Sequence, residues 1–262
     1  MHQQRLFILL ALIFTTVGAS ALELGDYRIV DLSHAYGEST LYWPTSPTAF
    51  EKKTLAYGDS GAGYFYSAYS VCTPEHGGTH IDAPAHFNQD GAPTDRIPLA
   101  SLIAPAVVID VTTQAAADRN YRVSAEDVEA FEAQHGRITA GTIVLARTGW
   151  SKFWPDALAY LGDDTPGDAT RLQFPGFSAA AMRLLAEHRG ARLIGIDTAS
   201  IDYGKSQDFI AHRIGAAAGV ANLENLTNLG ALPATGSLLM ALPMKIEGGS
   251  GGPVRVVALV PD

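Results

Sequence analysis

The sequence predicts a single α/β domain with a mixed, β-rich sheet, and two patterns indicate this fold class. Seven short runs rich in aliphatic and aromatic residues are separated by turn residues, whereas only three segments have the pattern of helices. These elements follow one another in irregular order, which disfavours a strictly alternating parallel sheet. With 262 residues, 47% of them hydrophobic, the chain can bury a substantial core.

The predicted strands are the runs in which apolar and β-branched residues predominate. They span residues 27–32, 64–71, 106–111, 142–147, 193–196, 236–242 and 254–259. No repeat or charged linker divides the chain, so one domain covering residues 22–262 is expected. Residues 160–176 are rich in Gly, Pro and Asp, which predicts a long surface loop.

Three helices are predicted from their start and stop signals. Ser124 followed by Asp127 forms an N-terminal capping pattern for the first helix, which a His-Gly pair ends. Ser178 begins the second helix, and residues 208–218 form the third.

The N-terminus, residues 1–21, has the pattern of a secretory signal peptide. Arg5 supplies the positive charge, residues 6–17 the apolar stretch, and Ala19-Ser20-Ala21 the small-residue cleavage site. The alternative is a membrane anchor, but 12 apolar residues fall short of the roughly 20 that cross a bilayer. The mature protein is therefore expected to be periplasmic or secreted and not held in the membrane.

The charge of the chain argues against nucleic acid and anionic membranes as partners. The formal net charge is −9, and loss of Arg5 with the signal peptide makes it −10. Both kinds of partner require basic patches, which so acidic a protein is not expected to offer.

Cys72 is the sole cysteine, so an internal disulfide is excluded. It lies four residues before a histidine, and a thiolate metal ligand is one interpretation. A small buried apolar residue is the favoured interpretation.

The most informative segment runs from residue 75 to residue 87. It brings His76, His80, Asp82 and His86 into eleven residues, together with two glycines and a proline. The glycines and the proline make a helix improbable here. A straight strand would separate His76 and His80 by about 13 Å, too far to share one metal ion. The chain is therefore expected to bend.

The bend is expected at Gly77 and Gly78, where the backbone is free to adopt unusual angles. His80 and Asp82 are two residues apart and then project to the same side of an extended chain. His76, His80 and Asp82 are thus predicted to hold one divalent metal ion. The contrary interpretation is a loop of hydrogen-bonded polar residues without metal.

Two imidazoles and one carboxylate leave coordination positions open for water and substrate, as in catalytic sites. Zn²⁺ and Mn²⁺ both suit this ligand set, which also matches the facial triad of non-haem iron oxygenases. His86 lies beside the ligands and is a candidate general base, because imidazole titrates near neutrality. The alternative role for His86 is to orient a ligand.

Residues 76–87 fit the pattern H-x-G-T-H-x-D-x-P-x-H-F, and on this motif the chain resembles the metal-dependent cyclase-like hydrolases. This family includes bacterial kynurenine formamidases and isatin hydrolases. The resemblance implies a swivelling β/β/α fold, a homodimer or larger homo-oligomer, and a proton-handling role for His86. It also implies that His212 and Glu224 help to hold a second metal ion, leaving open whether one ion or two are bound. Both are candidate catalytic residues, with His212 the alternative to His86 for returning a proton to the leaving nitrogen. The contrary interpretation is a pair on a helix surface or one that only orients the ligands.

Two further segments, residues 200–204 and 244–253, are similar to those of the isatin hydrolases. That similarity implies a small aromatic amide substrate, with hydrolysis of the isatin lactam to isatinate. Hydrolysis of N-formylkynurenine is the alternative. A function from another class is that of an exported protein that binds a metal or an aromatic ligand without turnover.

Several aromatic residues precede the motif, among them Trp43, Tyr64 and Phe65. They are candidates for the wall of a substrate pocket, since such pockets are mostly apolar. Core packing explains them equally well.

Ser250 and His34 are interpreted as structural residues and not as catalytic ones. Residues 248–252 fit the G-x-S-x-G pattern of serine hydrolases, but they lie between two predicted strands, whereas a nucleophile elbow needs a helix after the serine. Ser250 is therefore predicted to belong to a loop that lets backbone approach the site or a neighbouring subunit. His34, after the first strand, is a candidate for the pocket lining, but a hydrogen-bonded structural histidine is the favoured interpretation.

Overall fold

The computed structural model describes residues 24–262, so the predicted signal peptide lies outside the described residues. Its main sheet has eight strands in the order β1-β12-β11-β5-β7-β9-β10-β4. Because β4 pairs with both β10 and β12, seven of these strands close into a barrel and β1 extends it beside β12.

The strands of this sheet are β1 (Tyr27–Asp31), β4 (His80–Asp82), β5 (Ile103–Asp110), β7 (Ile143–Arg147), β9 (Leu193–Ile196), β10 (Ala221–Glu224), β11 (Ser237–Pro243) and β12 (Gly251–Pro261). Two small sheets pair β2 (Glu51–Asp59) with β3 (Phe65–Cys72) and β6 (Arg122–Val123) with β8 (Gly176–Phe177). The α-helices are α1 (Leu99–Leu102), α2 (Thr112–Ala117), α3 (Ala125–His135), α4 (Ala157–Leu161), α5 (Ala179–Arg183) and α6 (Ile210–Ala217). Short 3-10 turns are η1 (Leu24–Asp26), η2 (Pro84–His86), η3 (Thr94–Arg96), η4 (Trp150–Phe153) and η6 (Leu229–Ala231), and η5 (Leu184–His188) is a π-helical continuation of α5.

Strands β5, β7, β9 and β10 run parallel, and the remaining ladders of the barrel are antiparallel. One apolar cluster fills the barrel, and a second lies between the sheet and helices α3, α5 and α6. Burial on both faces explains the nearly continuous apolar sequences of β7 and β9. The predicted mixed, β-rich α/β fold is confirmed.

The helix-start signals were predicted correctly. Ser124 and Asp127 form a reciprocal capping box on α3, and the Ser178 side chain accepts a hydrogen bond at the start of α5. None of the helices described in residues 24–262 combines the length and apolarity needed to cross a membrane.

The predicted surface loop at 160–176 is only partly correct. Its ends are anchored, because Tyr160, Leu172 and Phe174 are fully buried. They pack with Trp150 and Leu161 in a third, mainly aromatic cluster. The composition correctly indicated a loop, but the side chains of Leu172 and Phe174 are buried in the core.

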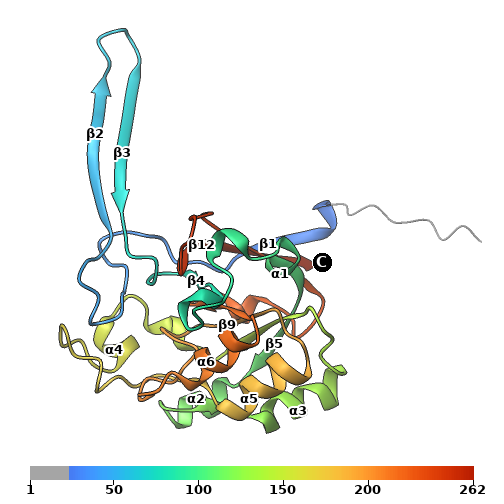
Figure 1. The fold of residues 1–262 in the computed structure, drawn as a ribbon. Helices are drawn as coiled ribbons and strands as arrows, with labels where there is room; N and C mark the ends of the chain where they lie inside the picture. Colours follow the sequence, from blue (N-terminus) through green and yellow to red (C-terminus); the bar gives the residue numbers. More distant parts are fainter. Residues whose placement is uncertain (1–23) are drawn as a thin grey trace, which may run out of the picture.

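The β2–β3 hairpin projects away from the barrel (Figure 1). Its apolar side chains are exposed, including Tyr57 at 72% and Phe65 at 63%. Cys72, at the end of β3, is exposed too, so the prediction of a buried cysteine was wrong. Alternating apolar residues predicted β3, whereas the charged start of β2 concealed that strand.

Candidate metal centre

The segment before β4 bends where the glycines predicted it. Gly77 and Gly78 have φ values of 150° and 56°, which only glycine adopts readily. A Cβ atom on Gly77 would clash with the Tyr42 ring, and one on Gly78 would lie 2.7 Å from the Tyr36 ring. Both the backbone angles and the close neighbours therefore require glycine.

This bend brings His76, His80 and Asp82 together, as expected. His76 Nδ1 lies 2.6 Å and His80 Nε2 3.2 Å from Asp82 Oδ1. One ligand atom from each residue lies within 4.8 Å of the others. We call these three residues the first ligand group.

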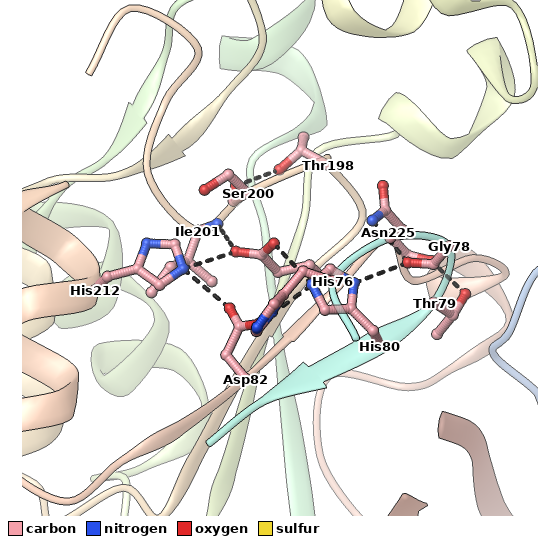
Figure 2. A network of polar contacts seen from close by, with 12 residues as sticks. His76, Gly78, Thr79, His80, Asp82, Thr198, Ser200, Ile201, His212 and Asn225 are labelled. Atoms are coloured by element: carbon pink, nitrogen blue, oxygen red, sulfur yellow. Dashed lines mark hydrogen bonds and ion pairs between the residues drawn. The ribbon is translucent and has the colours of Figure 1, made fainter. Parts of the chain in front are cut away.

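The second nitrogen of His80 fixes how its ring is turned. Its Nδ1–H donates to the Gly78 carbonyl at 2.9 Å (Figure 2), which leaves Nε2 to face Asp82. The Asn225 side-chain amide donates to the same carbonyl at 2.8 Å. No sequence pattern marks Asn225, because only the fold brings it within reach of the bend.

His212 and Glu224 complete a second ligand group with Asp82. His212 Nε2, from α6, lies 3.0 Å from Asp82 Oδ2 and 3.0 Å from Glu224 Oε1, from β10. Figure 2 shows His212 and Asp82 facing one another. Asp82 thus offers one carboxylate oxygen to each group.

Asp202 orients His212 from behind. His212 Nδ1–H donates to Asp202 Oδ2 at 2.8 Å, and the same carboxylate accepts the backbone N–H groups of Ala211 and His212. A carboxylate on the far nitrogen of a histidine is the usual support for a metal ligand. The sequence offers no spacing signal for Asp202, because it lies ten residues from His212 across a turn.

The electrostatics of this cluster favour positive charge beside its carboxylates. Burial by itself lowers the pKa of His80, but the Asp82 and Glu224 carboxylates outweigh it and raise that pKa to about 9. For Asp82, burial alone acts to raise the pKa, yet the His80 charge and hydrogen bonds from His212 and His76 hold it well below its usual range. A divalent cation would replace these protons as the source of positive charge, so the donor set fits a metal ion.

His86 lies at the edge of the same cluster, in η2. Its ring stacks on that of His76, with centroids 3.8 Å apart. Burial lowers the pKa of His86 to about 4, so the imidazole is neutral at physiological pH. Within residues 24–262 its ring nitrogens make no hydrogen bond, which leaves them available for proton transfer.

A cavity of about 280 Å³ opens onto both ligand groups. Most of its wall is apolar, and this part consists of Leu41, Trp43, Phe87, Leu161, Ala199 and Phe209. Trp43 was predicted as a wall residue, whereas Phe87 and Phe209 were not singled out. Tyr64 and Phe65 instead lie on the exposed β2–β3 hairpin and are absent from the cavity lining in the described part of the chain.

Two structural interpretations are decided by the geometry. Ser250 lies in a loop and is followed directly by strand β12, so it is no nucleophile elbow. His34 is not the hydrogen-bonded residue that was expected. Its buried Nε2 has no partner among the described residues, and the ring stacks on Trp154 with centroids 4.2 Å apart.

Comparison with known proteins shows the family of this chain. Residues 30–203 match the model of the Cyclase family, described as "Putative cyclase". The chain belongs to this family. It is 35% identical to the isatin hydrolase of Roseibium aggregatum, over 94% of this chain and 96% of that protein.

Two further relatives agree with this membership. A kynurenine formamidase from Salinibacter ruber is 30% identical over 87% of this chain and 96% of its own length. The crystal structure of an isatin hydrolase bound to the product analogue thioisatinate superimposes with a TM-score of 0.84 at 33% identity, covering 91% of this chain and 94% of that one. Within the family, the chain therefore resembles hydrolases that act on amide bonds.

Proposed function

We propose that the protein is a metal-dependent hydrolase that opens the lactam ring of isatin to isatinate. The observation that carries this proposal is the cavity, whose lining combines the polar first ligand group with apolar and aromatic side chains. A flat, neutral aromatic amide suits such a lining, with its carbonyl directed at the ligand group. The 35% identity to an isatin hydrolase supports the same substrate.

The alternative substrate, N-formylkynurenine, fits this lining less well. It carries an ammonium and a carboxylate group, whose burial requires partners of opposite charge. Among the described residues, those that line the cavity include no lysine or arginine to pair with the carboxylate. Isatin is neutral and needs no charged partner in the cavity.

We further propose that His76, His80 and Asp82 hold Zn²⁺ or Mn²⁺. A bound ion would supply Lewis-acid activation of water and of the amide carbonyl. Asp82, His212 and Glu224 form a place for a second ion, supported by the 3.0 Å that separates His212 Nε2 from each carboxylate. His212 is then engaged on both nitrogens, since Asp202 accepts from the other one.

His86 is therefore the residue left to move protons. Its neutral imidazole takes a proton from the attacking water and returns it to the ring nitrogen as the C–N bond breaks. Water thus adds OH to the carbonyl carbon and H to the nitrogen, giving a carboxylic acid and an arylamine. Stacking on His76 holds the His86 ring at the cavity edge, where this transfer is required.

The test compares His86→Ala with wild type for metal content and for hydrolysis of isatin, followed by absorbance. We expect full metal content with kcat lowered by about 10²- to 10⁴-fold, the usual contribution of a general base. His188→Ala, at an exposed position on η5, is the matched control. A metal-loaded wild type that hydrolyses neither isatin, N-formylkynurenine nor simple lactams would favour the binding-protein alternative.

We propose that the protein is exported, on the evidence of Arg5, the apolar residues 6–17 and the Ala19-Ser20-Ala21 site. Cleavage directly after Ala21 leaves Leu22 as the first residue of the mature protein. N-terminal sequencing of the protein recovered from the periplasm or the medium measures this. A mature protein that retains residues 1–21 would contradict export by this route.

We also propose that the chain forms a homodimer through the β2–β3 hairpin. An isolated two-stranded hairpin is marginally stable in water, and this one exposes Tyr57 and Phe65, whose rings meet edge to face at 5.2 Å. A second copy of the chain would cover these rings. Its surface is expected to be acidic, because the net charge is −9, and would attract the positive charges of Lys52 and Lys53 on β2.

Light scattering coupled to size exclusion tests the dimer. The double variant Tyr57→Ser, Phe65→Ser is expected to elute as a monomer, because it removes the apolar contact that a second copy would bury. Leu158→Ser, which changes an exposed apolar residue on α4, should leave the dimer intact. A monomeric wild type would contradict the proposal.

A further inference from the structure

Ser250 lies between Glu75 and His76, and the three side chains form a continuous hydrogen-bonded chain. Ser250 Oγ is 2.6 Å from Glu75 Oε2 and 2.8 Å from His76 Nε2. The backbone N–H of Ser250 donates to the same Glu75 oxygen at 3.0 Å. On the other side of the imidazole, His76 Nδ1 faces Asp82, so the chain ends at the first ligand group.

With a divalent cation in place of the proton between His76 Nδ1 and Asp82, the donors and acceptors around Ser250 allow one arrangement. An ionised carboxylate only accepts, so the single Ser250 hydroxyl hydrogen points to Glu75. Ser250 Oγ then accepts from His76 Nε2–H, which leaves the lone pair on Nδ1. We infer that Glu75 and Ser250 are positioning residues that hold His76 in the tautomer that presents Nδ1 to a divalent metal ion. This inference rests on the metal site proposed above.

The glycines around Ser250 allow its loop to come this close. A Cβ atom on Gly251 would lie 2.6 Å from His76 Cε1, and one on Gly249 would lie 2.8 Å from Glu75 Oε1. The Ser250 carbonyl accepts the Ala83 N–H at 2.9 Å, which ties the loop to the residue after β4. The G-x-S-x-G pattern therefore reflects close packing around His76.

His76 depends on such support more than the other ligand histidines do. The Gly78 carbonyl holds His80 directly, and the Asp202 carboxylate holds His212 directly. The His76 side chain is 27% exposed, against 3% for His80, so packing restrains its ring less. The Glu75–Ser250 pair supplies the restraint that burial does not.

The test measures the affinity for Zn²⁺ by chelator competition in wild type, Ser250→Ala, Ser250→Thr and Glu75→Gln. We expect Ser250→Ala to weaken binding by about 10- to 100-fold, as loss of such supports does elsewhere. Ser250→Thr keeps the hydroxyl and should stay within roughly threefold of wild type. Glu75→Gln should fall between them, because an amide can either donate to Ser250 or accept from it. Ser60→Ala, at the exposed hairpin turn, is the control.

A second readout separates positioning from a merely structural role. In the zinc-loaded protein, ¹⁵N NMR of the imidazoles is expected to show His76 protonated at Nε2 in wild type and to show that signal lost or shifted in Ser250→Ala. Unchanged zinc affinity and an unchanged His76 tautomer in Ser250→Ala would overturn the inference while leaving the metal site standing. A wild type that binds no divalent metal would instead overturn the proposed function, and the inference with it.

Discussion

The two ligand groups share Asp82 but are assembled in different ways. The first group, His76, His80 and Asp82, lies within seven residues of the chain and needs only a glycine bend. The second draws His212 from 130 residues beyond Asp82 and depends on α6 and on the pairing of β10 with β4. A local motif can therefore specify one ligand group, whereas the other forms only when the barrel is closed.

Asp82→Asn should have the largest effect, because it weakens both groups at once. We expect metal affinity to fall by more than about 100-fold, since loss of an outer support alone costs about 10- to 100-fold. Elemental analysis and chelator competition measure it. Asp110→Asn, which changes a half-exposed carboxylate paired with Arg147, is the control. Full metal content in Asp82→Asn would show that the shared carboxylate is not a ligand.

His76→Ala and His212→Ala should separate the two groups. The first variant is expected to lose the ion of the first group, and the second to lower the metal content from two ions per chain to one. Metal per chain, measured by elemental analysis, distinguishes them. A wild type that holds one ion, unaffected by His212→Ala, would restrict the metal centre to the first group.

Asp202→Asn should have a smaller effect, confined to the second group. The carboxylate orients His212 and also accepts two backbone N–H groups at the start of α6. We expect about 10-fold weaker binding of the second ion, with the first unchanged. Asp164→Asn, at an exposed position in the loop after α4, is the control. Equal weakening of both ions would indicate that the groups are coupled.

The last prediction concerns the stability of the metal-free protein and how it depends on pH. In the metal-free protein the carboxylates raise the pKa of His80 to about 9, above its ordinary value of 6.5. This stabilisation is fully present below pH 6.5 and is lost as pH rises towards 9, with a slope of at most about 1.4 kcal/mol per pH unit for one proton. Urea unfolding of chelator-treated protein measures it. His80→Gln should remove the share of one proton, and His212, whose pKa the carboxylates also raise, should keep a slope of its own. A metal-free stability that does not fall over this range would contradict the charge argument.

Much of the fold was predictable because it follows from local patterns. Strand β9 coincides with its predicted span, and the Ser124–Asp127 capping box of α3 was recognised from two residues. Strands β4 and β10 were missed because they are short and polar: His80, Asp82 and Glu224 serve the site, and Asn222 is a further polar residue. Polar residues stand at positions where an apolar pattern would have indicated a strand.

The sequence by itself determined the first ligand group, since glycines at 77 and 78 allow the bend that joins His76 to His80 and Asp82. Only the tertiary structure decided which distant side chains join it. Pairing of Glu224 with His80 across β10 and β4, and the approach of the Ser250 loop to His76, depend on strand register. Register is set by the packing of the whole barrel, and no short stretch of sequence contains that information.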